Sequence, residues 1–460
     1  MTHLAAFKAY DIRGQVPADL DETLARQIGR AYAELFSPRK MIIGQDIRDS
    51  SPMLANAVAE GLMECGVDVI DIGLCGTEMV YFGAFSLEDD GVDGGIMVTA
   101  SHNPMGFNGM KLVQKGARPI SGDTGLKDIE RRCVEGVKAF GDKRGSKVER
   151  DLMPAFSKHL MQYVDLEALK EENPLSLVVN AGNGCAGPAL DAMAAQLPFT
   201  FHRVHHEPDE AFPNGIPNPL IEENRTSTIT AMKEHKADLG IAWDGDFDRC
   251  FFFDENGRFI EGYYLVGLFG EEMLRQAKGT SDEISVIIHD PRLMWNTQEM
   301  VADAGGKAVC SKTGHAFIKE RMRKEDAIYG GEMSAHHYFK SFAYCDSGMI
   351  PWLLLTQIMC RTGKTLSQLV EDRMKKFPAS GEINRRLEDP QAAIIRVRNA
   401  FEKDAVDVDE TDGLSLSFAK WRFNLRTSNT EPVLRLNVES RGDEELMQEK
   451  TAALLVLIEA

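Results

Sequence analysis

The chain has 460 residues, of which 43% are hydrophobic and 27% are charged, and its 52 Lys and Arg against 71 Asp and Glu give a net charge of −19. This length predicts about three or four domains, and the composition is that of an ordinary globular protein, which argues against intrinsic disorder. The negative charge argues against nucleic acid or an anionic membrane as the main partner, because both attract cationic surfaces.

The N-terminus lacks a charged segment followed by a long apolar stretch, and nowhere do about 18 apolar residues run together. Neither secretion nor membrane spanning is therefore expected. The eight cysteines include no C-x-x-C pair and lie in apolar, strand-like surroundings, as reduced core thiols do. These features predict a cytoplasmic protein.

The first third of the chain alternates helical and strand-like patterns, which predicts an α/β layer domain. A basic polar stretch at 142–147 is typical of a connector that ends it. The expected helices are 20–35 and 52–63, and the expected strands are 41–43, 67–72 and 95–98.

The alternation then resumes and predicts two further α/β passages. Glu255-Asn256-Gly257 separates two apolar runs, and Asn-Gly in that setting is a strong signal for a β-hairpin. The expected helices are 152–163, 263–275 and 315–323, and the expected strands are 175–179, 239–243, 285–288 and 308–310.

The pattern changes after residue 364, where strands and helices no longer alternate. This smaller tail predicts an α+β domain rather than a layered α/β one. Its expected elements are a helix at 366–375, strand-like runs at 414–423 and 433–438, and a final helix at 444–458.

A serine stands where a buried strand is expected to lead into a loop. The apolar run 95–98 is followed by Thr99-Ala100-Ser101-His102-Asn103-Pro104, and such a hydroxyl is well placed to react. Taken alone, the segment is also typical of an Asx or proline turn. A Ser-His-Asp hydrolase is a further interpretation, but no G-x-S-x-G elbow surrounds Ser101, and an immediately following histidine is poorly placed to act as its base.

Three carboxylates on alternate residues, Asp244, Asp246 and Asp248, follow the apolar run 239–243. Carboxylates so spaced in a tight loop can converge on one hard cation, and magnesium is the expected occupant. An EF-hand calcium loop is excluded because Arg249 occupies its glycine position and the flanks are strand-like. Arg249 beside the carboxylates indicates that both face a phosphate. Together with Ser101 the loop indicates phosphoryl chemistry, and a solvated acidic turn is the structural alternative.

Two later loops carry groups suited to a phosphorylated sugar. The segment 330–337 gathers a carboxylate, a hydroxyl and two imidazoles, with a capped turn as the alternative. The segment 424–432 offers an arginine, hydroxyls and an amide to a phosphate, with Arg435 nearby and an ordinary polar hairpin loop as the alternative. The turn 180–184 opens an expected helix, and we interpret it as a tight structural turn rather than an anion site.

In this order, the motifs resemble the α-D-phosphohexomutase family in its phosphomannomutase/phosphoglucomutase branch. The resemblance covers essentially the whole chain and rests on Phe7 to Gly14, Thr99 to Pro104, Asn108 to Lys111, Asp244 to Arg249, Gly331 to His336 and Arg426 to Pro432. It implies a heart-shaped four-domain architecture around a central cleft. The implied domains are three similar mixed α/β modules at 1–147, 148–249 and 250–362 and a smaller α+β module at 363–460.

The resemblance also implies roles for single residues. Ser101 would be a phosphoserine whose phosphoryl oxygen joins the three aspartates of the aspartate loop 244–249, Asp244, Asp246 and Asp248, around Mg²⁺. Arg249 and Lys111 would steady the transferring phosphoryl group, with His102 and His336 as further catalytic groups and His336 as a candidate proton carrier. The implied substrate-binding residues are Tyr10, Arg13, Arg292, His315, Glu332, Ser334, His336, Arg426, Ser428, Asn429 and Thr430.

The activity implied by the resemblance is reversible interconversion of mannose 6-phosphate and mannose 1-phosphate, which would supply GDP-mannose synthesis. A hexose 1,6-bisphosphate would serve as intermediate and activator, and the partner would be this small phosphosugar. The segment 332–334 favours hexoses with a free 2-hydroxyl, by the same resemblance. Phe247 and Ala335 replace glycines common in the family, and Arg292 stands where some relatives carry lysine, which leaves the sugar preference open.

Other activities stay open at this point. A phosphoglucomutase or a dual-specificity enzyme is the first alternative, followed by a phosphoglucosamine mutase and a serine-dependent phosphatase. A non-catalytic phosphosugar-binding module is the alternative from a different class. The sequence does not predict the oligomeric state.

Overall fold

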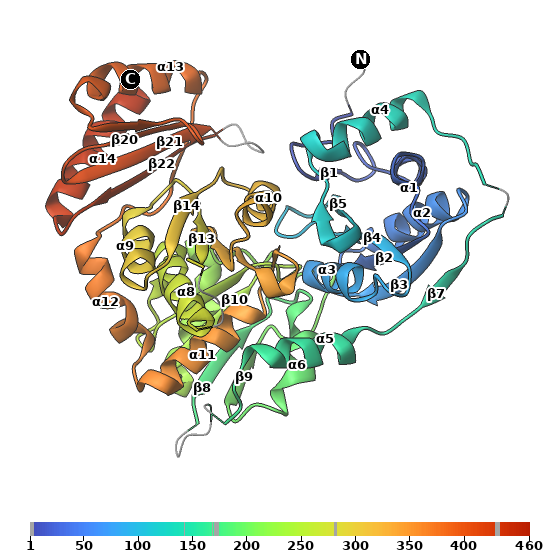
Figure 1. The fold of residues 1–460 in the computed structure, drawn as a ribbon, viewed down its shortest axis with the longest axis horizontal. Helices are drawn as coiled ribbons and strands as arrows, with labels where there is room; N and C mark the ends of the chain where they lie inside the picture. Colours follow the sequence, from blue (N-terminus) through green and yellow to red (C-terminus); the bar gives the residue numbers. More distant parts are fainter. Residues whose placement is uncertain (1–3, 142, 168, 170–173, 280–282, 428–432) are drawn as a thin grey trace. The chain divides into compact units, whose positions relative to one another are not determined.

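The computed structural model describes residues 4–141, 143–167, 169, 174–279, 283–427 and 433–460 (Figure 1). The chain forms two compact units. The first comprises Met1–Phe259 and Ser341–Gly363, and the second comprises Ile260–Lys340 and Lys364–Ala460. Among the described residues, no helix combines the length and apolar character needed to cross a bilayer.

The first sheet of the first unit has the strand order β1-β5-β4-β2-β3-β7, with β6 beside β5. Strands β4, β2 and β3 are parallel, whereas β5 runs antiparallel to β4 and β1. The strands are β1 (Ile12–Gln15), β2 (Lys40–Gln45), β3 (Asp68–Leu74), β4 (Val92–Val98), β5 (Phe107–Gln114), β6 (Arg118–Pro119) and β7 (Lys147–Glu149), and the helices are α1 (Glu22–Phe36), α2 (Ser51–Met63), α3 (Thr77–Ser86) and α4 (Lys127–Glu135).

Two adjacent glycines of β4 show how helices cover both faces of this sheet. A Cβ on Gly94 would lie 2.4 Å from the hydroxyl of Tyr32 on α1, and a Cβ on Gly95 would lie 2.7 Å from Val80 on α3. Since successive residues of a strand face opposite sides, α1 and α3 lie on opposite faces. The paired ends of β2 and β4, where Gln45 is the partner of Val98, place residues 46–51 beside the serine loop 99–104.

The second sheet of the first unit has the order β12-β11-β10-β8-β9. Strands β8, β9 and β10 are parallel, and β11 pairs antiparallel with β10. The hairpin predicted around Asn256 and Gly257 is confirmed by the adjacent strands β11 and β12. The elements are β8 (Ser176–Asn180), β9 (Thr200–Val204), β10 (Leu239–Trp243), β11 (Cys250–Phe253), β12 (Phe259–Ile260), α5 (Met153–Leu160), α6 (Ala186–Ala194) and α7 (Thr226–His235). The later segment of this unit contributes α11 (Ile350–Thr362) and the short strand β17 (Cys345–Asp346), which is not part of this sheet.

The predicted domain boundary after residue 249 falls between β10 and β11, which pair in one sheet, and β11 therefore extends that sheet past residue 249. The aspartate loop is thus the connection between two neighbouring strands.

The second unit contains a layered part and an antiparallel part. In the layered part, β14, β13 and β15 are parallel neighbours and β16 pairs antiparallel with β15. Its elements are β13 (Val286–His289), β14 (Lys307–Cys310), β15 (Tyr329–Gly331), β16 (His337–Phe339), α8 (Gly262–Ala277), α9 (Trp295–Asp303), α10 (His315–Glu325) and α12 (Leu366–Lys376).

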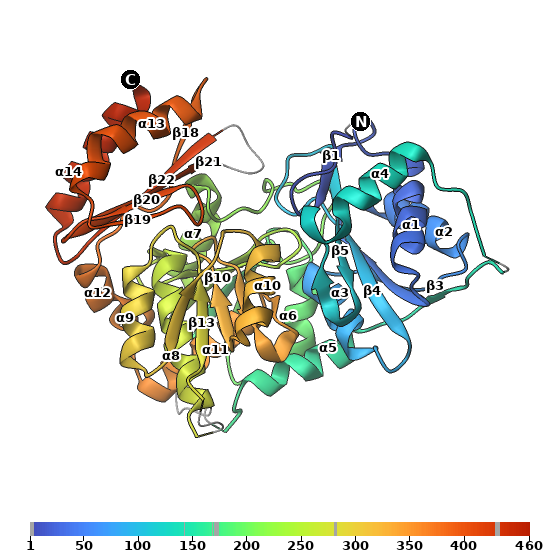
Figure 2. The ribbon, with the colours of Figure 1, turned by 45° about the horizontal axis from the view of Figure 1, so that its top comes forward.

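The antiparallel sheet of the second unit has the order β18-β22-β21-β20-β19, with α13 and α14 on one face (Figure 2). The predicted strand 414–423 is wrong as one strand, because the chain reverses between Phe418 and Trp421 and forms β20 and β21. The elements are β18 (Ile383–Arg386), β19 (Asp407–Asp409), β20 (Leu414–Ser417), β21 (Trp421–Thr427), β22 (Val433–Ser440), α13 (Pro390–Phe401) and α14 (Glu444–Glu459).

Candidate active site

Ser101 lies in the loop that follows β4, and 5% of its surface is exposed. Its φ of +49° is in the left-handed region, which is costly for a residue with a side chain and persists only where contacts hold it. The Ser101 N–H donates to Thr99 Oγ1 at 2.8 Å. Its hydroxyl donates to Asp244 Oδ2 at 3.0 Å, so the serine loop and the aspartate loop meet.

Two residues that the sequence analysis missed hold this loop from the segment just after β2. Asp46 accepts hydrogen bonds from Thr99 Oγ1 at 2.8 Å and from the N–H of Ala100 at 2.9 Å. Arg48 donates from Nη2 to the carbonyl of Ser101 at 3.1 Å. Burial raises the pKa of Asp46 and lowers that of Arg48. These side chains fix the backbone before and after Ser101.

The three aspartates of the aspartate loop are buried. Each offers one carboxylate oxygen to a common point, and these three oxygens lie within 4.8 Å of one another. Asp246 Oδ1 is a buried oxygen without a hydrogen-bond partner among the described residues. A buried orphan acceptor needs a partner, and a set of hard oxygen donors suits a hard divalent cation. The loop therefore fits a metal ion.

Two cationic side chains pair with these three carboxylates. Lys111 Nζ lies 2.6 Å from Asp246 Oδ2 and 2.5 Å from Asp248 Oδ2. Arg249 donates to Asp244 Oδ2 from Nε at 2.9 Å and from Nη2 at 2.7 Å. Burial opposes the charged form of Lys111, but Asp246 and Asp248 outweigh it and raise its pKa. Both predicted phosphoryl-contacting cations thus lie in the same cluster as Ser101.

The sequence analysis considered His102 poorly placed to act as the base of Ser101, yet the structure brings its ring beside the Ser101 hydroxyl. Its Nδ1 lies 3.1 Å from Ser101 Oγ, because the left-handed backbone of Ser101 does not send neighbouring side chains to opposite sides as a strand does. Arg249 Nη2 also contacts Nδ1, and since a guanidinium can only donate, Nδ1 is the acceptor and Nε2 carries the proton. Burial and the charges of Arg249 and Arg13 lower the pKa of His102 well below its ordinary value, which keeps it neutral.

Phe247, at the centre of the aspartate loop, is fully buried with a φ of +43°. A Cβ on Gly76, just before α3, would lie 2.2 Å from the Phe247 ring. Next to Gly76, the N–H of Thr77 donates to Asp246 O at 3.0 Å and its hydroxyl donates to Asp246 Oδ2 at 2.5 Å. The ring fills the space that Gly76 leaves, and α3 thereby supports the aspartate loop.

Arg13 in β1 also contacts the serine loop, through Nη1 to Asn103 Oδ1 at 3.2 Å. Its Nη2 pairs with Asp11 Oδ2 at 2.6 Å. Burial opposes the charged form of Arg13, but Asp11 outweighs it and raises the pKa. Tyr10, three positions before Arg13, is half-buried.

In the second unit the structure brings together four predicted substrate-binding residues. Arg292 Nη2 lies 3.3 Å from Ser334 Oγ and 3.7 Å from Glu332 Oε1. His336 Nδ1 lies 3.5 Å from Ser334 Oγ. Glu332 Oε1 accepts from the N–H of Gly314 at 2.8 Å, which ties this loop to the start of α10, where His315 lies.

Arg426 belongs to an arginine cluster that shares Arg292 with this group and is built around a carboxylate that the sequence analysis missed. Glu382 Oε2 lies 3.3 Å from Arg426 Nη2 and 3.3 Å from Arg292 Nη1. Ser428, Asn429 and Thr430, predicted to bind the same phosphate, lie outside the described residues.

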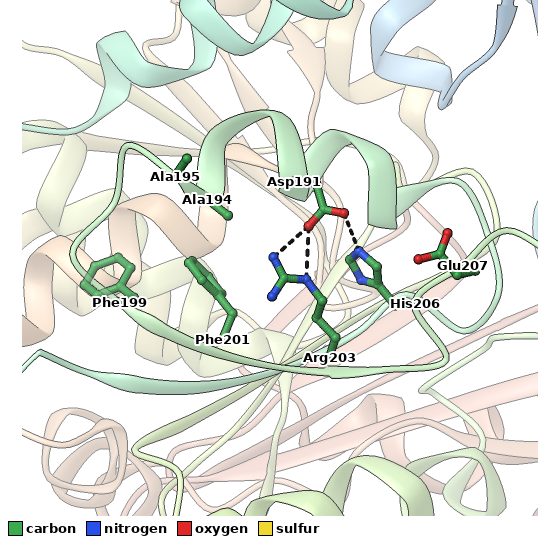
Figure 3. Close-up of a pocket in the computed structure, with 8 residues that line it drawn as sticks. All are labelled: Asp191, Ala194, Ala195, Phe199, Phe201, Arg203, His206 and Glu207. Carbon is green, nitrogen blue, oxygen red and sulfur yellow. Dashed lines mark hydrogen bonds and ion pairs between the residues drawn. The ribbon is translucent and has the colours of Figure 1, made fainter.

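A hollow of about 600 Å³ lies between α6 and β9, and the residues described as lining it include none of the predicted site residues (Figure 3). Asp191 accepts from Arg203 Nη2 at 2.8 Å and lies 2.8 Å from His206 Nε2. These groups satisfy one another, as exposed ion pairs commonly do.

Models of one family match the chain along its length. The four domains of the phosphoglucomutase/phosphomannomutase family match residues 4–138 (alpha/beta/alpha domain I), 154–257 (domain II), 261–377 (domain III) and 382–455 (C-terminal domain). These matches confirm the predicted class of fold.

The chain is also similar to curated proteins and solved structures. It is 58% identical to a protein of Salmonella montevideo named phosphomannomutase, over 100% of both chains, and 56% identical to a Xanthomonas campestris protein named phosphohexose mutases, over 99% of both. A crystal structure of a phosphoglucomutase/phosphomannomutase family protein from Burkholderia thailandensis is 31% identical, with a TM-score of 0.86 over 100% of this chain and 98% of that one. With its four domains and its serine and aspartate loops in place, the chain belongs to the phosphoglucomutase/phosphomannomutase family.

Proposed function

We propose that the chain is a phosphomannomutase, which interconverts mannose 6-phosphate and mannose 1-phosphate. The observation that carries the proposal is the hydrogen bond from Ser101 Oγ to Asp244 Oδ2 at 3.0 Å, which joins a reactive hydroxyl to a cluster of buried carboxylates. The sugar is taken from the relatives, since the protein of Salmonella montevideo, 58% identical over the full chain, is named phosphomannomutase.

The metal in this proposal is Mg²⁺, held by Asp244, Asp246, Asp248 and a phosphoryl oxygen on Ser101. The orphan oxygen Asp246 Oδ1 and the oxygen-only donor set support a hard divalent ion there. When bound, the ion supplies positive charge against which a phosphoryl group can be transferred.

The first transfer breaks the bond between phosphorus and Ser101 Oγ and forms a bond from phosphorus to a sugar hydroxyl oxygen. The proton of that hydroxyl passes to a base, and Ser101 Oγ takes up a proton to become a hydroxyl again. Arg249 and Lys111 donate hydrogen bonds to the transferring group, because both already lie among the carboxylates that face Ser101. The second transfer returns the other phosphoryl group of the hexose 1,6-bisphosphate to Ser101. The net result is a sugar phosphorylated at the other end.

Two histidines have different roles in this scheme. His102 is neutral and its Nδ1 accepts from Arg249, so its role is to orient Arg249 and Ser101 rather than to act as the base. His336 is half-buried beside Ser334 and Glu332 and is our candidate for the base.

Most of the proposed substrate contacts belong to the second unit. Glu332 and Ser334 would bind sugar hydroxyls, with His315 nearby, and Arg292 and Arg426 would bind the phosphate that is not transferred. Tyr10, Arg13, Ser428, Asn429 and Thr430 are carried over from the family resemblance as further contacts. The proposal extends to a cytoplasmic enzyme whose mannose 1-phosphate is consumed in GDP-mannose synthesis.

The proposal is tested by a coupled assay with mannose 1-phosphate, glucose 1-phosphate and glucosamine 1-phosphate, each with its 1,6-bisphosphate. Mannose 1-phosphate should have the highest kcat/KM, and a preference for glucose would make the enzyme a phosphoglucomutase instead. Steady release of inorganic phosphate would identify a phosphatase.

A pair of serine variants tests the nucleophile. Ser101→Ala should abolish turnover and the phosphopeptide that contains residue 101. Ser157→Ala removes another buried serine hydroxyl, on α5, and should keep turnover. Full activity in Ser101→Ala would exclude the phosphoserine mechanism.

A further inference from the structure

The carboxylate of Glu382 lies among three guanidinium groups of the second unit. Its Oε2 is 3.3 Å from Arg292 Nη1 and 3.3 Å from Arg426 Nη2, and its Oε1 is 3.2 Å from Arg435 Nη1. The side chains of Arg292 and Arg426 are 2% and 4% exposed, whereas that of Glu382 is 21% exposed. The carboxylate therefore stands at the solvent side of a largely buried cationic cluster.

The strands force two of these arginines together. Arg426 in β21 and Arg435 in β22 are direct cross-strand partners, and like charges in such a pair repel. Arg292, from the loop after β13, adds a third positive charge. Burial and the charge of Arg292 lower the pKa of Arg426, which shows the strain of gathering these cations. The cluster requires an anion to be stable.

Planar guanidiniums that converge on one point are the usual means by which proteins bind phosphate, and a carboxylate offers them the same paired oxygens. Glu382 thus has the contacts that a phosphate monoester would make. Burial opposes its ionisation, but Arg292, Arg435 and Arg426 outweigh burial and lower its pKa, so the group is an anion at neutral pH.

With Glu382 in place the cluster has no spare positive charge for a phosphate. Arg292 also pairs with Asp290 at 2.8 Å and lies 3.7 Å from Glu332, and Arg426 lies 4.0 Å from Asp412. Among the described residues, these three carboxylates together with Glu382 outnumber the three arginines. A dianionic phosphate can gain the full attraction of the guanidiniums only if Glu382 moves away.

We infer that Glu382 is an internal substitute for the sugar phosphate, which occupies the arginine cluster in the empty enzyme and is displaced when a phosphosugar binds. The inference rests on the proposed function, which assigns Arg292 and Arg426 to phosphate binding. The displacement has a use in that reaction, because the bisphosphate must leave the cluster and turn before the second transfer. The return of Glu382 stabilises the arginines as the phosphate departs and so favours release.

The test compares phosphate affinities in a Ser101→Ala background, which prevents turnover. Calorimetric titration with inorganic phosphate and with mannose 6-phosphate should show that Glu382→Gln, which keeps the shape but not the charge, lowers Kd about tenfold. Glu382→Asp, which keeps the charge on a shorter arm that reaches fewer guanidiniums, should lower Kd by about threefold. Glu382 directly precedes β18, and Glu388 lies just after it. Glu388→Gln removes this exposed glutamate and should leave Kd unchanged.

An equal or weaker affinity for phosphate in Glu382→Gln, at an unchanged melting midpoint, would overturn the inference and make Glu382 an orienting group for the arginines. If Glu382→Gln does not fold, Glu382→Asp carries the test, and an unchanged or raised Kd has the same consequence. With Ser101 intact, Glu382→Gln should also lower kcat together with KM. Phosphate affinity can be measured whether or not mannose 1-phosphate is turned over, so failure of this inference is distinct from failure of the proposed function.

Discussion

Arg48 holds Ser101 from the far side of its peptide, through hydrogen bonds from Nη2 to the carbonyl of Ser101 at 3.1 Å and to the carbonyl of Asn103 at 2.5 Å. These two hydrogen bonds help to keep the hydroxyl of Ser101 directed at Asp244. Without this side chain the left-handed backbone of Ser101 would lose one of the contacts that offset its cost.

Arg48→Met keeps an unbranched apolar side chain and removes the guanidinium, which supplies the donors and lies over the ring of Phe212. We expect kcat to fall about 100-fold, because small displacements of a reacting group are costly, while KM changes little. Inorganic phosphate release per turnover should rise as the phosphoserine becomes exposed to water. Arg131→Met, on the exposed face of α4, is the control. Wild-type kcat in Arg48→Met would refute the positioning role.

Gly245 allows the aspartate loop to approach the serine loop. A Cβ on residue 245 would lie 2.7 Å from the carbonyl oxygen of Ser101, which is too close for a backbone contact. Gly245→Ala should therefore separate Ser101 from Asp244 and lower kcat at least about tenfold.

Gly270→Ala is the matched control for this substitution. In the interior of α8, its Cβ would meet Ile287 and Val301 at an ordinary 3.4 Å. Activity should be kept, and thermal stability should rise by up to about 1 kcal/mol from helix propensity. Equal activity in the two variants would show that the loops tolerate separation.

Lys111 occupies part of the carboxylate cluster and competes with a divalent cation for Asp246 and Asp248. Lys111→Met leaves these buried carboxylates without their ammonium, which should destabilise the metal-free first unit by about 3–5 kcal/mol. Magnesium should then bind more tightly than in the wild type and restore more of the thermal stability. Titration calorimetry and melting curves with and without EDTA measure both effects.

Lys115→Met changes an exposed lysine on the same part of the chain and should alter neither quantity. Magnesium affinity in Lys111→Met at or below the wild-type value would mean that the ammonium supports the cation rather than competing with it.

His337 makes the second unit sensitive to acid. Burial lowers its pKa to about 3, and the charge of His336 acts in the same direction. The ordinary pKa of histidine in an unfolded chain is about 6.5, so below that pH the unfolded state binds a proton that the folded state does not. Stability from this residue is complete above pH 6.5 and is lost as the pH falls toward 3.

His337→Gln keeps an acceptor for the hydroxyl of Tyr329, which lies 2.7 Å from His337 Nδ1, and cannot be protonated. Between pH 7.5 and 5.0 the variant should lose about 2 kcal/mol less stability than the wild type. His235→Gln, at an exposed position on α7, should keep the wild-type slope of melting midpoint against pH. Identical slopes in His337→Gln and the wild type would contradict the assignment.

The parts of the site that could be predicted from sequence are those that follow an apolar strand. Ser101 after β4 and Asp244 after β10 were identified because a buried strand leaves its next polar residue at the sheet edge. Most helices and strands were likewise predictable from the period of their apolar residues, as in α1 and β10.

Other residues could not be predicted because their partners are distant in the chain. Asp46 and Arg48 act on the serine loop only because β2 lies beside β4, an order that periodicity does not reveal. Polar residues at the end of β2 were the available signal. Glu382 has partners 90 and 44 residues away and no pattern around it. The placement of His102 depended on the left-handed φ of Ser101, a conformation that sequence rules assign to glycine.

The packing of Phe247 against Gly76 links two positions that are 171 residues apart in the sequence. Any side chain at position 76 would have to enter the space of the Phe247 ring. A substitution at 76 is therefore tolerable only after Phe247 has become smaller, whereas a smaller residue at 247 first opens a cavity under the aspartate loop. The order of the two mutations therefore decides whether the protein that carries only one of them still works. The pair can change if Phe247 is replaced first, and it is blocked if Gly76 is replaced first.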